Sequence, residues 1–235
     1  MATAKDFQYV HPQSPHLLDD SIRPVPDPGQ AYHLTMNEKF WSRRAQDAVN
    51  VQYAAGGEPF EANLKRDGGL FSGSKRMILQ SKNGKPIAIL LRNWTMLSSK
   101  FKLYAFKPSY QGQVPSKHRS DDGKPLFTWA EVLHPPFSMQ YIMKESDGTV
   151  YVADRVGRVC GPKQFKLKRN GKTCASIQLD PGPHMFSKKV WDIKIAPGID
   201  PCRILCFIAI IEAIIEASRR AAVAGAAGGA AVVAG

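Results

Sequence analysis

The fold of this chain is decided by residues 200–220, which read DPCRILCFIAIIEAIIEASRR. Asp200 and Pro201 predict the start of a helix, because an aspartate accepts hydrogen bonds from the first backbone N–H groups and proline fits the first helical position. Two arginines close the stretch, where cations interact favourably with the helix dipole. No residue in 204–211 is polar. A helix that is apolar on every side has to be enclosed by protein or by lipid.

Enclosure by lipid is the weaker of these two interpretations. The apolar block 204–215 would form a helix about 18 Å long at about 1.5 Å per residue, whereas the hydrocarbon core of a bilayer is roughly 30 Å thick. Glu212 falls inside the block and would cost roughly 2.5–3.5 kcal/mol near mid-span. We therefore predict no transmembrane span, with a tail anchor or interfacial helix as the alternative. The predicted core helix buries Ile204, Leu205, Phe207, Ile208, Ile211 and Ile215.

Short strand-like runs fill most of the chain before this helix. They span 32–36, 49–53, 59–64, 75–81, 86–93, 100–106, 126–133, 138–144, 149–154, 163–169, 173–179 and 189–196. Apolar and polar residues alternate clearly in 163–169 and 189–196, as they do in a half-buried strand. Four dipeptides that tolerate positive φ predict type I′ hairpin turns, namely Asn83-Gly84, Asp122-Gly123, Asp147-Gly148 and Asn170-Gly171. Segment 38–47 is compatible with a second helix, a polar loop or a short strand.

The domain organisation follows from composition. Residues 1–29 contain five prolines and predict a poorly ordered arm, residues 30–220 a single domain, and residues 221–235 an Ala/Gly-rich tail. We expect this tail to be poorly ordered, with some helix at its start. A polar loop, 109–124, separates two series of strands, and loops of this length are often functional or disordered.

Composition and charge restrict the class of protein. The 235 residues are 43% hydrophobic and 22% charged, as in an ordinary globular protein. The start, MATAKDFQYVHPQS, has no apolar run, and four cysteines without a secretory signal favour a reducing, cytoplasmic location. The net charge of +12 favours an anionic partner, such as a phospholipid surface, a phosphoinositide, nucleic acid or an acidic protein. The alternative is that the charge serves only solubility.

Catalytic and metal-binding motifs are missing from the sequence. It holds no Cys-x-x-Cys, His-Glu-x-x-His or Gly-x-Ser-x-Gly, so we expect a non-enzymatic protein with no cofactor and no metal site. Cys202 and Cys206 lie one helical turn apart with no other ligand nearby, which favours a core role. Residues 68–75, GGLFSGSK, resemble a phosphate-binding loop. However, Ser74 separates the second glycine from the lysine, and a strand-like run follows where a helix would be needed.

Basic residues nevertheless concentrate around this segment. Glycine-rich backbone beside a lysine and an arginine can hold an anion without catalysis. The candidate lipid headgroup-binding residues are Lys75, Arg76, Lys82, Lys85, Arg92, Lys100 and Lys102. Each basic residue near an acidic bilayer contributes roughly 1 kcal/mol, so four or five would suffice for peripheral binding. The alternative is a solvated strand face. A second basic cluster at 163–172 alternates with Phe165 and Leu167, as any half-buried strand requires, and does not imply base stacking.

Three stretches resemble the LURP-one-related family, whose members are tubby C-terminal-like proteins related in fold to tubby and the phospholipid scramblases. Residues 190–200, VWDIKIAPGID, followed by an apolar helix, resemble the close of the family's domain. Residues 74–91, SKRMILQSKNGKPIAILL, are similar to its strand, Gly-Lys-Pro turn and strand, and residues 99–104, SKFKLY, to the strand that follows. The resemblance spans residues 31–220.

The resemblance implies a mainly β fold, a closed barrel of 12 antiparallel strands around a central C-terminal hydrophobic helix. In that fold Glu212 and Glu216 would emerge at the barrel mouth and pair with Arg219 and Arg220. The implied function is non-enzymatic binding of phosphoinositides or anionic membranes through a basic face, at the membrane periphery, in a regulatory or stress-related role. A membrane-anchored or lipid-handling, scramblase-like protein that uses the helix is the alternative, although an acidic calcium loop is missing. A nucleic-acid-binding regulator is the third hypothesis.

Overall fold

The structure is a computed structural model that describes residues 32–38, 47–53, 60–67, 76–81, 83–95, 98–135, 138–156, 164–180, 189–196 and 198–232. Within them, twelve strands precede one helix. Their bounds are β1 Tyr32–Glu38, β2 Asp47–Tyr53, β3 Phe60–Asp67, β4 Arg76–Ser81, β5 Pro86–Thr95, β6 Ser98–Ala105, β7 Phe127–Leu133, β8 Gln140–Glu145, β9 Val150–Val156, β10 Gln164–Arg169, β11 Lys172–Asp180, β12 Lys189–Ile195 and α1 Pro201–Val232. The predictions for residues 1–29, for most of segment 38–47 and for 68–75 lie outside the described residues.

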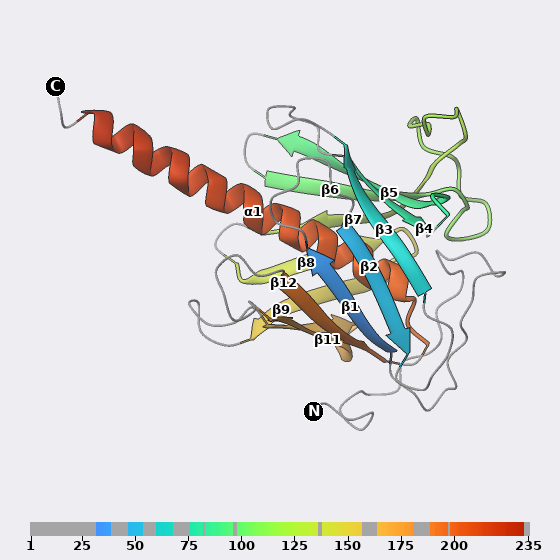
Figure 1. The fold of residues 1–235 in the computed structure, drawn as a ribbon. Helices are drawn as coiled ribbons and strands as arrows, with labels where there is room; N and C mark the ends of the chain where they lie inside the picture. Colours follow the sequence, from blue (N-terminus) through green and yellow to red (C-terminus); the bar gives the residue numbers. More distant parts are fainter. Residues whose placement is uncertain are drawn as a thin grey trace.

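Every strand pairs antiparallel with the strand that follows it in sequence. β1 also pairs with β12, with Tyr32 opposite Ile195, and the hydrogen-bonded order is β1-β12-β11-β10-β9-β8-β7-β6-β5-β4-β3-β2. Figure 1 shows these strands arranged around the first half of α1. The predicted mainly β, antiparallel architecture with one C-terminal helix is confirmed.

The meander places alternate connections at two opposite ends. The β4–β5, β6–β7, β8–β9 and β10–β11 connections share one end with the link from β12 to α1, which we call the helix-entry end. The β5–β6, β7–β8, β9–β10 and β11–β12 connections lie at the other, the helix-exit end. Figure 1 shows α1 leaving the strands at this second end and continuing away from them.

The start of α1 follows the sequence closely. Asp200 Oδ1 accepts a hydrogen bond of 2.8 Å from the backbone N–H of Cys202, so the predicted cap is confirmed. The helix then fills the space between the strands. Ile204, Phe207, Ile208 and Ile211 are buried, as is Leu205, while Ile215 is partly buried against the same core.

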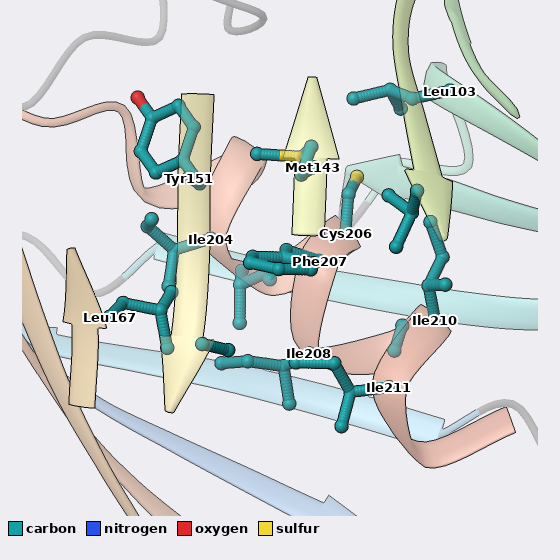
Figure 2. Packing of buried hydrophobic residues seen from close by; sticks show 14 of the residues in the cluster. Leu103, Met143, Tyr151, Leu167, Ile204, Cys206, Phe207, Ile208, Ile210 and Ile211 are labelled. Carbon is teal, nitrogen blue, oxygen red and sulfur yellow. The ribbon is translucent and has the colours of Figure 1, made fainter. Parts of the chain in front are cut away.

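The strands supply the other half of this core. In Figure 2, helix residues Ile204, Cys206, Phe207, Ile208, Ile210 and Ile211 lie among Leu103, Met143, Tyr151 and Leu167, which come from β6, β8, β9 and β10. All ten side chains are at most 2% exposed. The apolar block is therefore enclosed by protein, against the hypothesis that it enters a bilayer. Among the described residues, no helix contains an apolar stretch long enough to cross a membrane.

The late helix departs from prediction. Glu212 is 4% exposed and accepts a hydrogen bond of 2.8 Å from Trp191 Nε1, so the prediction that it emerges at the barrel mouth is wrong. The buried indole N–H of β12 needs an acceptor, and the carboxylate supplies it. The side chains of Glu216, Arg219 and Arg220 lie outside the described part. The helix also continues to Val232, far into the predicted poorly ordered tail, because alanine has the highest helix propensity.

The hairpin turns are of two kinds. Asn170 and Gly171 have φ of 47° and 84°, which confirms the predicted type I′ turn there. At the other three sites only the glycine has positive φ, so the I′ prediction is wrong. At Gly84 the N–H donates to Ser81 O while Ser81 N donates to Lys85 O, the pattern of a type I turn followed by a left-handed glycine. The same two bonds recur around Gly123 and Gly148.

Candidate functional site at the helix-entry end

Several of the candidate headgroup-binding residues lie on the outer face of β4 to β8. One cross-strand row runs Arg76, Leu91, Lys102, Glu131 and Lys144, each opposite the next. Their sequence neighbours Met77, Leu90, Leu103, Ala130 and Met143 are buried in the core. Since successive residues of a strand point to opposite faces, the row lies outside.

This row is of mixed charge. Arg76 Nη1 contacts Asp121 Oδ1 at 2.5 Å, and Lys100 Nζ lies 3.7 Å from Glu131 Oε1. Glu131 also stands between Lys102 and Lys144 in the register. The outer face of these strands is therefore an ion-paired surface, and its acidic members reduce its attraction for an anion.

The structure separates the remaining predicted residues. Lys85 is exposed in the β4–β5 turn at the helix-entry end. Arg92 is buried on the inner side, opposite Phe101, with its Cζ 5.9 Å from that ring, and burial lowers its pKa. Arg92 therefore lies apart from the candidate residues on the outer face. Lys75 and Lys82 lie outside the described residues.

The polar loop between β6 and β7 is packed against the outer face. Gln113 Nε2 donates to Thr128 O at 2.6 Å, while Gln113 Oε1 accepts from Ser109 N at 2.7 Å. Ser116 N donates to Leu126 O at 2.7 Å. Leu126 joins Ile78, Ile89 and Tyr104 in a small second core outside the strands, and the His118 ring lies 5.2 Å from that of Tyr104. The loop is thus a fixed structure at the helix-entry end.

A buried ion pair closes the same end from within. Arg203 and Glu145 are each 3% exposed, and Arg203 Nη1 donates to Glu145 Oε1 at 2.6 Å. Arg203 Nε lies 3.6 Å from Asp200 Oδ2, and its Cζ lies 4.6 Å from the ring of Trp129. Trp129 Nε1 in turn donates to Lys107 O at 2.6 Å. No local sequence pattern predicts this cluster, although Arg203 is the single charge between the helix cap and the apolar block.

Burial and charge act against each other in this pair. Burial raises the pKa of Glu145 from 4.5 to about 7, while the Arg203 guanidinium opposes the rise. Burial would lower the pKa of Arg203, but Glu145 and Asp200 outweigh it and the pKa is raised. The pair joins the first turn of α1 to the end of β8, so its role is to fix the helix within the strands.

The described part of the helix-entry end exposes a basic surface. Among the described residues, its exposed cations are Lys85, Lys117, Arg119, Lys124, Lys144 and Lys172, and its exposed carboxylates are Asp121, Asp122 and Asp147. Asp121 contacts Arg76, and Asp122 Oδ2 contacts Lys124 Nζ at 2.5 Å. Hydrogen bonds from Lys124 and Ser120 lower the pKa of Asp122 to about 2. Asp147 Oδ1 accepts a hydrogen bond from Thr149 N. Among these described residues, the cations outnumber the carboxylates, and each of the carboxylates already has a partner.

The second basic cluster lies on the opposite wall. Lys168 Nζ contacts Asp154 Oδ2 at 2.8 Å, and Lys166 is exposed opposite Asp154 and Ser176. Phe165 and Leu167 are buried, so neither offers a ring or an apolar face to a nucleic-acid base. The described residues of this wall provide no stacking platform.

The cysteines behave as core residues. Cys174, Cys202 and Cys206 are free thiols, and burial raises the pKa of each. In the described part of the chain, no three His, Cys, Asp or Glu side chains are grouped so as to hold a metal.

The sequence comparison agrees with this architecture. The profile of the LURP-one-related family matches residues 32–212, which are 181 of the 235 residues. This chain belongs to the LURP-one-related family. The match begins with β1 and ends at Glu212, the buried partner of Trp191, so the LURP-one-related region covers the strands and the enclosed part of α1. No curated protein and no solved structure matches the chain.

Proposed function

We propose that this LURP-one-related protein is a non-enzymatic module that binds anionic membrane surfaces through its helix-entry end. The ligands would be acidic phospholipids or phosphoinositides. The observation that carries the proposal is the excess of exposed cations among the described residues of this end, where the three described exposed carboxylates already have partners.

The packed interior supports binding on the outside. Phe207, Met143, Leu103 and Tyr151 are all fully buried around the axis of α1. A charged ligand placed among these side chains would lose its hydration without gaining partners. We therefore assign recognition of an anion to the outer surface, where the exposed cations of the helix-entry end lie.

The exposed cations at this end would contribute a measurable free energy of binding to an anionic bilayer. Each Lys or Arg near an anionic bilayer contributes about 1 kcal/mol, so removing two such charges should weaken binding about thirtyfold. Lys85 and Lys172 are the suitable pair, because both are exposed in hairpins of the helix-entry end. A matched control is the pair Lys166 and Lys194, which share an outer row on the opposite wall.

The proposal is tested by co-sedimentation with vesicles of phosphatidylcholine alone, with added phosphatidylserine, and with added phosphoinositide, across a salt series. We expect binding to the anionic vesicles that weakens with salt, a large loss in Lys85→Gln/Lys172→Gln, and a small loss in Lys166→Gln/Lys194→Gln. Equal binding to neutral and anionic vesicles at low salt would refute it. A salt-dependent mobility shift with nucleic acid, without vesicle binding, would assign the charge to nucleic acid instead.

We also propose that the closed barrel of 12 strands is the working form of the protein. The pairing of Thr35 with Asp192 joins β1 to β12, and directly opposed residues have Cα atoms about 4.5–5.5 Å apart, within disulfide range. Thr35→Cys/Asp192→Cys should cross-link on mild oxidation. Thr35→Cys/Gln178→Cys, which spans two strand spacings, should not. Equal cross-linking in both variants would contradict closure.

The proposal extends to a cytoplasmic location at the membrane periphery and a regulatory or stress-related role. Three buried, free thiols support a reducing compartment. Fractionation of cells that express the full chain tests the location, with release from membranes by high salt as the expected behaviour of an electrostatic contact.

A further inference from the structure

Large apolar side chains are exposed at few places in the described part of the chain. Tyr110 is 46% exposed, Val114 79% and Met139 51%. Tyr110 and Val114 lie in the β6–β7 loop at the helix-entry end, whereas Met139 lies in the β7–β8 connection at the helix-exit end. Among the described residues, the basic end thus carries a pair of exposed apolar residues close together in sequence, and the other end carries one.

The β6–β7 loop presents this pair on a fixed backbone. Gln113 N donates to Tyr110 O at 3.3 Å, and Gly112 between them has φ of 84°, so residues 110–113 form a tight turn whose ends lie within about 7 Å. The Gln113 side chain is held by Ser109 and Thr128. Because the backbone is already ordered, the exposed side chains can contact a partner without the entropy cost of ordering a loop.

The charges around this pair fit an anionic bilayer. Lys117 and Arg119 follow within ten residues and are exposed, while the loop carboxylates Asp121 and Asp122 are held in ion pairs. Tyrosine is enriched where apolar and aqueous regions meet at a membrane surface, because its ring is apolar and its hydroxyl is polar. Cations beside an apolar tip attract acidic headgroups as the tip enters the interface.

We propose that Tyr110 and Val114 are membrane-insertion residues, which enter the headgroup region of an anionic bilayer when the helix-entry end docks on it. This inference rests on the proposed function and adds the contact residues and the orientation. The β6–β7 loop faces the membrane, and the part of α1 beyond the strands points away from it, since it leaves at the opposite end (Figure 1).

The orientation is measured with a polarity-sensitive nitrobenzoxadiazole label on single cysteines, Val114→Cys and Met139→Cys, in a full-length Cys160→Ser background. The cysteines at 174, 202 and 206 are buried and should not label. With phosphatidylcholine/phosphatidylserine vesicles, we expect blue-shifted, brighter emission at position 114 that brominated acyl chains quench, and unchanged emission at position 139. Met139 is a matched control, because it is also an exposed apolar residue.

The outcomes separate the inference from the proposed function. If the protein sediments with anionic vesicles while the label at 114 stays in water, insertion is wrong and the proposed function stands. A response at 139 in place of 114 would reverse the orientation and overturn the inference. If the chain does not bind anionic vesicles at all, both proposals fall.

A second measurement uses unlabelled protein. Tyr110→Ser/Val114→Ser should reduce vesicle partitioning about tenfold or more, since it removes one large and one medium apolar contact, while leaving the salt dependence unchanged. Lys117→Gln/Arg119→Gln should instead reduce the salt dependence, and Met139→Ser should change nothing. If the serine double variant binds vesicles as well as the wild type and has an unaltered unfolding midpoint, the inference is overturned. The exposed apolar pair would then be assigned to contact with a protein partner.

Discussion

The buried pair between Arg203 and Glu145 gives a sharp prediction about stability. Arg203→Met removes the guanidinium and leaves the Glu145 carboxylate at 3% exposure without its hydrogen-bond donor. Breaking a buried ion pair on one side typically costs 3–5 kcal/mol, so we expect a loss of about 3 kcal/mol or more in the free energy of unfolding. Asp200, also fully buried, loses a nearby cation and adds to the loss.

A double variant distinguishes the effect of the buried charges from the effect of the space that the two side chains fill. Arg203→Met/Glu145→Met replaces both charges by apolar side chains, and such replacements are often neutral or stabilising. We therefore expect the double variant to be more stable than Arg203→Met alone by about 2 kcal/mol or more. Lys168→Met is the matched control. It breaks the Lys168–Asp154 pair, whose side chains are 43% and 24% exposed, and should cost less than about 1 kcal/mol.

Urea denaturation at about pH 8, above the pKa of about 7 that Glu145 has in the folded protein, provides the measurement, with the slope m checked for equality among the four proteins. The reasoning is refuted if Arg203→Met costs no more than Lys168→Met. It is also refuted if the double variant is as unstable as the single one, because the loss would then come from packing around the guanidinium and Trp129.

Three further predictions concern the interior. Phe207→Ala should cost about 3–5 kcal/mol because Phe207 is fully buried, whereas Val114→Ala should change stability by less than about 0.5 kcal/mol; similar losses in the two would contradict the core. Burial raises the pKa of Glu145 from 4.5 to about 7, so between these pH values the folded chain holds a proton that the unfolded chain releases. The resulting stabilisation of the folded chain is complete below pH 4.5 and is lost as pH rises through 7. The difference in unfolding free energy between wild type and Glu145→Gln should therefore fall by up to about 3 kcal/mol across that range, and a rise would show the opposite shift. In a Cys160→Ser variant, the three buried thiols should react with Ellman's reagent only on unfolding, since burial raises the pKa of Cys174 to about 12 and the pKa values of Cys202 and Cys206 as well; rapid reaction of the native protein would contradict enclosure.

Local patterns predicted much of this fold. The Asp200 cap, the apolar block after it and the alternating strands depend on residues close in sequence, and each lies where the pattern placed it. The turns show the limit of such patterns. Asn-Gly or Asp-Gly identifies a hairpin, but the loop length decides between a type I′ turn and a type I turn with a left-handed glycine.

The parts that sequence reasoning missed depend on distant residues. Arg203 and Glu145 are 58 residues apart, and Glu212 of α1 accepts its hydrogen bond from Trp191 of β12. No local pattern predicts either contact. Arg92 is different, because it lies two residues after Leu90 and four after Ala88, on the buried face of the strand. The two-residue period of a strand therefore predicts that Arg92 is not part of the basic surface. The β6–β7 loop appears polar in sequence, yet Leu126 and Gln113 anchor it to the strands.

The central claim is that strands, and not lipid, enclose the apolar half of α1, and backbone hydrogen exchange tests it most directly. With the full chain in buffer without vesicles, we expect the amides of residues 204–214 to be among the slowest to exchange, since their side chains are buried within the strands. Addition of phosphatidylserine vesicles should then slow exchange in the β6–β7 loop and leave residues 204–214 unchanged. Rapid exchange of residues 204–214 in buffer, with protection only when vesicles are added, would contradict the account.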